Sequence, residues 1–123
     1  MKDLFLIILG GGLGSACRYL ISLAAGRRFG ETFAWGTLAV NLLGCLFIGF
    51  LIGLIDRSIV SQTFRMLLVT GFLGGFTTFS TFSLESTRMI ISGSIDKALI
   101  NIGLNVIAGL GLTVGGLFVA ARI

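Results

Sequence analysis

The sequence predicts an all-α membrane protein with four transmembrane helices. Hydrophobic residues make up 55% of the 123 residues and charged residues only 11%, whereas a soluble globular domain carries about a quarter charged residues. Four apolar runs also reach about 20 residues, the length that crosses a bilayer as a helix. Strands of a membrane barrel alternate over about ten residues, so runs this long and uniform favour helices.

The four predicted spans leave little of the chain outside the membrane. They cover Leu4–Ala25, Phe33–Ile55, Met66–Ile91 and Ala98–Ala121, joined by short polar connections at Gly26–Thr32, Asp56–Arg65 and Ser92–Lys97. An even number of spans places both termini on the same side of the membrane. We expect residues 1–123 to form a single transmembrane domain, whose first span is retained rather than removed as a signal peptide.

The composition also excludes several classes of function. The chain has no His, and its two cysteines, Cys17 and Cys45, lie in apolar runs without metal-ligand spacing, which argues against a zinc or haem site. The net charge of +4 comes from nine scattered Lys and Arg residues, which form no basic patch for nucleic acid. Without His no nucleophile–base pair is visible, so we expect no enzyme.

Small residues and balanced charges point to a particular assembly. Glycines recur at the four-residue spacing of close-packing helix faces, and a bundle of four short helices has little interior, so a dimer is the simplest expected form. Apart from Arg18, near the end of the first span, the basic residues divide four against four between the two sides, which gives the positive-inside rule almost no preference. This balance favours dual topology and an antiparallel dimer; the alternative is an orientation fixed by other features. The glycine pairs are Gly10/Gly14, Gly49/Gly53, Gly71/Gly75 and Gly111/Gly115.

The third span is predicted to break near its middle. Two adjacent glycines followed by a run of Thr and Ser make a poor helix centre, and we place the break near Gly74–Thr78. A broken membrane helix leaves backbone groups unpaired, which is tolerated where they meet an ion or line a cavity. Freed carbonyls suit a cation, whereas freed amides and hydroxyls suit an anion.

Other polar residues within the spans have a functional and a structural interpretation. Asn41, central in the second span, can donate into a polar path or bond another helix. Phe79 and Phe82 share one helical face, where they can pack or present positive ring edges to an anion. Arg18 and Glu85 fit a vestibule and a span end equally well.

Three segments resemble the Fluc fluoride channels, also called CrcB. They are Gly11–Tyr19, Gly36–Gly44 and Gly71–Glu85; the third is highly specific, and the first two together are nearly so. The fourth span matches only in being apolar and rich in Gly. One departure is Ser15, where the family usually has Ala, a small-for-small change.

The resemblance implies a fluoride channel that exports the ion passively from the cytoplasm across the bacterial inner membrane. It implies an antiparallel, dual-topology homodimer with two pathways and a central structural sodium ion. Arg18 would be a structural or vestibule charge, and Glu85 would lie near a pathway mouth. Backbone carbonyls of Gly74 and Thr77 would hold the sodium. The residues implied along each fluoride pathway are Asn41, Phe79, Ser80, Thr81 and Phe82.

Two other classes of function compete with this hypothesis. A proton-coupled exporter of small cations can also be a four-span antiparallel dimer, but it requires a buried carboxylate in the first span, which this chain lacks. A non-transporting membrane scaffold would need only the glycine faces. The resemblance implies fluoride and a second copy of the chain as partners, together with the lipid bilayer that the four spans require.

Overall fold

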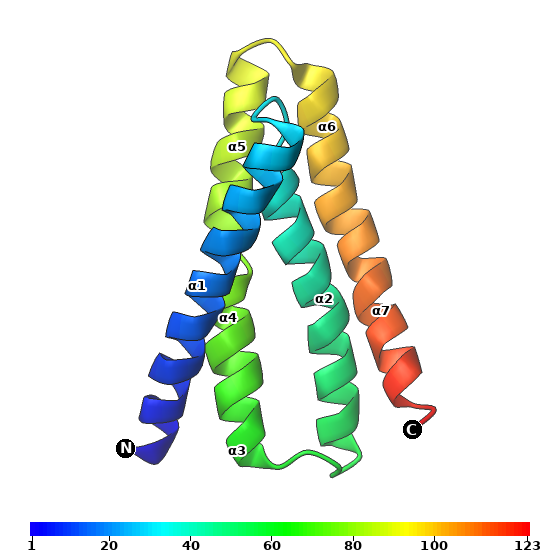
Figure 1. Ribbon diagram of the computed structural model, residues 1–123. Coiled ribbons are helices and arrows are strands. Elements are labelled where there is room, and N and C mark those ends of the chain that lie inside the picture. The colour runs from blue at the N-terminus through cyan, green and yellow to red at the C-terminus, as the bar shows by residue number, and fades with distance from the viewer.

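Four helical spans run side by side along one axis in the computed structural model, which describes all of residues 1–123 (Figure 1). The first two spans are α1 (Lys2–Phe29) and α2 (Trp35–Asp56). The third consists of α3 (Gln62–Phe64), the π-helical segment η1 (Arg65–Leu73), α4 (Gly74–Phe76) and α5 (Phe79–Ile91). The fourth consists of α6 (Ile95–Gly103), the π-helical segment η2 (Leu104–Ala108) and α7 (Gly109–Ala120). All four spans are long and apolar enough to cross a membrane, as predicted.

All four helical spans begin or end outside the predicted apolar runs, the second by only one residue. α1 continues past the predicted end at Ala25 to Phe29, so the predicted connection Gly26–Thr32 is mostly helix. Gly30, whose φ of 78° suits glycine, ends it. Hydropathy marks only the stretch that belongs in lipid, whereas Arg27 and Arg28 extend the helix because cations are favourable at a helix C-terminus.

Both termini lie at the same end of the bundle, as the even number of spans predicts (Figure 1). The connection between α2 and α3 lies at this end, and the other two connections lie at the opposite end. Basic residues therefore flank both ends: Lys2, Arg57, Arg65 and Arg122 at one, and Arg27, Arg28, Arg88 and Lys97 at the other.

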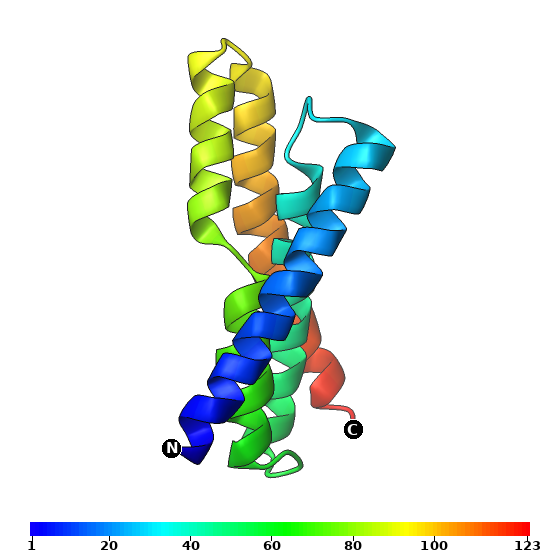
Figure 2. The same ribbon diagram turned by 60° about the vertical axis from the view of Figure 1, so that its left-hand side comes forward.

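The bundle has a thin interior and an apolar exterior. Only 20 of 123 residues are buried, and large apolar side chains cover the outside, the arrangement expected of helices that face lipid. α1 packs along η1 and α4, α2 packs along α7, and α5 packs along α6. α5 and α6 form a hairpin that stands apart from the end of α1 (Figure 2). Val40, Leu73 and Phe76 form the small core where α2 meets the third span.

Glycines allow the closest helix crossings. A Cβ on Gly10 or Gly14 would collide with backbone oxygens of η1, and a Cβ on Gly75 would collide with the carbonyl of Gly11. At the crossing of α2 with α7, a Cβ on Gly49 would collide with the carbonyl of Thr113. Three of the predicted packing faces therefore lie at helix contacts within the chain, since Gly53 also meets α7.

The fourth predicted glycine face makes no close contact within this chain. A Cβ on Gly111 or Gly115 would meet nothing within 4 Å, whereas Gly109 and Gly116 face α2 closely. The four-residue spacing identifies a stripe of small residues, but it does not say which side of the helix a neighbour occupies. Here the neighbouring helix α2 lies on the other side of α7.

Candidate functional site

The third span is interrupted at Thr77 and Thr78, within the predicted range Gly74–Thr78. Thr77 has φ −85° and ψ 159°, and Thr78 has φ −152° and ψ 117°, so both residues are extended. They link α4 to α5 at the middle of the bundle, where the ribbon narrows to a strand-like connection (Figure 2). The predicted break is confirmed.

The side chain of Asn41 replaces the lost helical partners of Thr78. Its Oδ1 accepts from the backbone N–H of Thr78 at 2.8 Å, and its Nδ2 donates to the Thr78 carbonyl at 3.1 Å. The second N–H of Nδ2 donates to Oδ1 of Asn105 at 2.9 Å. An amide has two N–H donors, so both are engaged within the chain, and the interhelical bond considered for Asn41 is present.

The carbonyls of Gly74 and Thr77 are among those that lose their helical partners at the break. In a continuous helix Gly74 would accept from the N–H of Thr78, which instead donates to Asn41. Thr77 would accept from the N–H of Thr81, which instead donates to the Thr78 hydroxyl at 3.2 Å. These are the two carbonyls that the resemblance assigns to sodium.

Arg18 reaches the break from α1. Its guanidinium donates to the freed carbonyl of Thr77 at 3.3 Å. The hydroxyl of Ser15, one turn earlier, is 3.4 Å from the carbonyl of Gly75, a long hydrogen bond. Arg18 therefore contacts the broken backbone in this structure and lines neither of the cavities described below.

Phe79 and Phe82 lie beside the break in one cavity. Their ring centroids are 5.4 Å apart at an interplanar angle of 59°; Phe79 is 78% exposed on the outside of the bundle, and Phe82 is 8% exposed. The cavity of about 370 Å³ is also lined by Asn41, Gly74 and Thr77. No Lys or Arg lines it, so its polar surface is neutral.

The hydroxyls after the break cap α5. The Thr78 side chain accepts from the N–H of Thr81 and donates to the Thr81 hydroxyl at 3.1 Å, which is an N-cap. The hydroxyl of Ser80 is 3.4 Å from that of Thr78. Ser80 is exposed and lines neither cavity, whereas Thr81 lines a second one.

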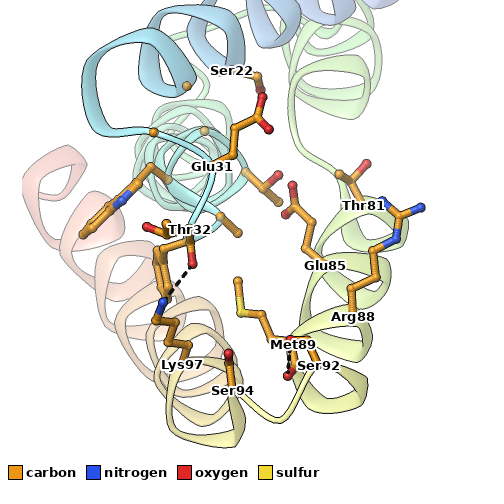
Figure 3. A pocket seen from close by; sticks show the side chains of 17 residues that line it. Ser22, Glu31, Thr32, Thr81, Glu85, Arg88, Met89, Ser92, Ser94 and Lys97 are labelled. Atoms are coloured by element: carbon orange, nitrogen blue, oxygen red, sulfur yellow. Dashed lines mark hydrogen bonds between the residues drawn. The ribbon is translucent and has the colours of Figure 1, made fainter.

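The second cavity opens at the end of the bundle opposite the termini and has a volume of about 730 Å³. The carboxylate of Glu85 points into it and that of Glu31 lies toward Ser22 at its edge, whereas the head group of Arg88 turns away from Glu85 (Figure 3). Oε2 of Glu85 is buried and has no hydrogen-bond partner. Lys97, on the rim, donates to the carbonyl of Thr32 at 3.4 Å. Glu85 therefore lines a wide polar mouth.

The structure brings most of the predicted residues together but divides them between the two cavities. Asn41, Gly74, Thr77, Phe79 and Phe82 surround the first, at the break. Thr81 and Glu85 surround the second. The division follows helical spacing, because residues four apart on α5 share a face.

Three polar residues escaped the sequence analysis. Asn105 donates to Oδ1 of Asn101 at 3.1 Å and to its carbonyl at 2.9 Å, and Asn101 donates to the Ser86 hydroxyl at 3.0 Å. Asn101 is fully buried. The signal was available, because two Asn residues four apart in an apolar span must be satisfied by other protein groups. In the sequence, the more obvious feature of that span is its apolar, Gly-rich composition.

Comparison with known proteins places the chain in a well-populated group. The family described as CrcB-like protein, Camphor Resistance (CrcB), matches residues 5–117. A protein of Maridesulfovibrio salexigens named fluoride-specific ion channel FluC is 44% identical over 118 residues, covering 95% of this chain and 94% of that protein. Proteins of the same name are 41% identical in Flavobacterium psychrophilum, over 100% of both chains, and 50% identical in Phocaeicola vulgatus, over 76% of this chain and 77% of that protein.

Proposed function

Because the chain belongs to the CrcB family of fluoride-specific ion channels, an integral multi-pass membrane family and not a family of enzymes, we propose that it conducts fluoride passively out of the cytoplasm. One observation carries the proposal. Asn41, Phe79 and Phe82 line one neutral cavity at a break in a membrane-spanning helix.

The chemistry of this cavity suits a small, strongly hydrated anion. Fluoride must exchange its water for other hydrogen-bond donors, and the Asn41 amide is an uncharged donor in the lining of this cavity. The tilted ring pair of Phe79 and Phe82 adds weakly positive edges. Fixed cations would bind fluoride more strongly, but conduction needs sites weak enough to release the ion. The absence of Lys and Arg from the lining fits this need.

The driving force requires no coupling device. Hydrogen fluoride is a weak acid, so it enters the cell neutral and ionises inside. The inside-negative membrane potential then drives the anion out through an open path. Fluoride leaving the first cavity toward the end opposite the termini would pass Thr81 and then the mouth lined by Glu85.

The proposed assembly is an antiparallel, dual-topology homodimer in the bacterial inner membrane, with two fluoride pathways. Four basic residues at each end give neither orientation an advantage. Phe79 and Gly74 are exposed on the outside of the bundle beside the break, where a second copy could complete the lining. A thin bundle with 20 buried residues has little room for a complete path of its own.

The residues at the break fit a structural sodium ion shared by two copies. Carbonyls freed by an unwound helix are known sodium ligands in membrane proteins, and Gly74 and Thr77 each lose a helical partner. Such an ion would supply positive charge between the two pathways. Within one copy, Arg18 occupies the Thr77 carbonyl, so this guanidinium would act there as a structural charge.

The two competing functions explain less of the geometry. A proton-coupled cation exporter needs a carboxylate within the membrane, and the only acidic residue of α1 is Asp3, in its first turn. A membrane scaffold would need the close helix contacts at glycines. That function does not explain why two phenylalanines and an amide surround a neutral cavity.

Flux from liposomes tests the proposal. Purified protein should release fluoride when a potassium ionophore sets the potential, with no proton counterflow. Phe82→Ile should abolish release because it removes a ring from the cavity, and Asn41→Asp should abolish it because a carboxylate repels the anion and cannot donate. Phe47→Ile is the matched control, since Phe47 is 46% exposed and lies outside the cavity. Unchanged flux in both site variants would reject the site.

A further inference from the structure

The hydrogen bonds beside the break include a chain of side-chain amides, in which each amide accepts from one neighbour and donates to the next; Asn41 also donates back to the Thr78 carbonyl. Thr78 donates its backbone N–H to Asn41, Asn41 donates to Asn105, Asn105 donates to Asn101, and Asn101 donates to Ser86. We call Asn41, Asn105, Asn101 and Ser86 the amide relay. It joins α2, η2, α6 and α5 across the bundle.

The break dictates the orientation of every amide in the relay. A backbone N–H can only donate, so the Asn41 oxygen must accept from Thr78 at 2.8 Å, while its nitrogen donates one N–H back to the Thr78 carbonyl at 3.1 Å and directs the other away from the break. This second N–H of Asn41 requires an acceptor, so Asn105 presents its oxygen to it. The nitrogen of Asn105 then donates to the carbonyl and the side-chain oxygen of Asn101. Rotating any one amide by 180° would place two donors or two acceptors face to face.

This arrangement creates a conflict with the proposed channel function, on which the inference rests. For Asn41 to donate to fluoride, one of its two N–H groups must be free, and both are engaged. The bond to the Thr78 carbonyl belongs to the pair that satisfies the broken backbone. The bond to Asn105 is the one that can be exchanged, because both Asn41 and Asn105 line the cavity that holds the phenylalanines.

We propose that Asn105 is a positioning residue that competes with fluoride: its Oδ1 accepts from the second N–H of Asn41 until the anion displaces it, while Asn101 keeps Asn105 in the accepting orientation. Fluoride, as an anion, is a stronger acceptor than a neutral amide oxygen, so the exchange is favourable. When no ion is present, the hydrogen bond to Asn105 keeps the Asn41 donor satisfied. It also weakens net fluoride binding, which favours release.

Two structural details support this role. Asn105 lies in the π-helical segment η2, and π-helical insertions frequently occur at functional sites. Its partner Asn101 is fully buried at 0% exposure, donates to Ser86 and accepts from Asn105. The bond to Asn101 therefore fixes the orientation of the Asn105 amide. Neither bond of Asn41 to Thr78 uses a group of Asn105, so we expect both to survive when Asn105 is replaced.

The test compares Asn105→Leu with wild type in the fluoride dependence of flux. Loss of a competing neutral hydrogen bond should lower the half-saturating fluoride concentration by roughly 2- to 10-fold. Thr113→Val is the matched control, since the Thr113 hydroxyl bonds only within its own helix, to the carbonyl of Gly109, and it should leave that concentration unchanged. A residue with a merely structural role would lower the amount of folded protein or the maximal flux without lowering half-saturation.

A second readout does not depend on flux. In fluoride-free protein with ¹⁵N-labelled asparagine, Asn105→Leu should shift one side-chain N–H proton of Asn41 toward the value of an unbonded amide. If Asn105→Leu does not fold because the Asn101 oxygen is orphaned, Asn101→Leu/Asn105→Leu replaces both halves and carries the same expectations.

The outcomes separate this inference from the proposed function. Wild-type protein that releases no fluoride overturns both. Wild-type protein that conducts, together with an Asn105 variant whose half-saturating concentration is unchanged or raised, overturns the competing role of Asn105 alone. A lowered concentration with the shifted Asn41 resonance supports it.

Discussion

Replacing Asn41 by Leu, a side chain of similar size, should strongly destabilise the protein. Asn41 makes three hydrogen bonds, two of them to the backbone of Thr78. At about 0.5–1.5 kcal/mol net for each bond, their loss amounts to about 1.5–4.5 kcal/mol. The upper part of this range is expected because the N–H and C=O of Thr78, which is 8% exposed, would be left without partners.

The assay is reversible unfolding in mixed micelles followed by circular dichroism. Measurements should be made without fluoride and at one fixed protein concentration, because ligands and oligomers shift apparent stability. Thr113→Val provides the reference for losing a polar group from an apolar span, and it should cost under about 0.5 kcal/mol because only a local bond is removed. An Asn41→Leu effect no larger than that of Thr113→Val would refute the view that Asn41 stabilises the break.

Two further changes test the break and the crossings by the same assay. Thr78→Val removes the hydroxyl that caps the N–H of Thr81 and should cost about 1 kcal/mol; no change would show that the cap is unimportant. Gly75→Val drives a side chain into the carbonyl of Gly11 and should cost about 1–3 kcal/mol or more. Gly111→Val, which meets open space, should cost clearly less within a single copy in dilute micelles, and equal costs would contradict the packing described.

Local composition was enough to predict the main features of the fold. Two glycines and a run of Thr and Ser are poor helix formers wherever they occur, so the break near Gly74–Thr78 could be placed to within a few residues. Apolar length likewise predicts the spans. It does not predict where α1 ends at Phe29, because helix propensity and end charges continue beyond the apolar run.

Pairings between spans could not be predicted, because they depend on which faces meet. Asn41 stands out in its span, but nothing local indicates that Thr78 and Asn105 are its partners. The same limit applies to Gly111 and Gly115, which face no helix of this chain, since spacing does not reveal the position of a neighbouring helix. The roles predicted for the two phenylalanines stay predictions, although the structure places both at one cavity.

The measurement that tests the central claim most directly is the release of fluoride and chloride from the same liposomes, loaded with both anions and held at one potential. The account predicts rapid fluoride release with chloride retained, because neutral donors around a small cavity favour the anion that needs strong hydrogen bonds. Equal release of the two anions, or no release of either, would contradict it.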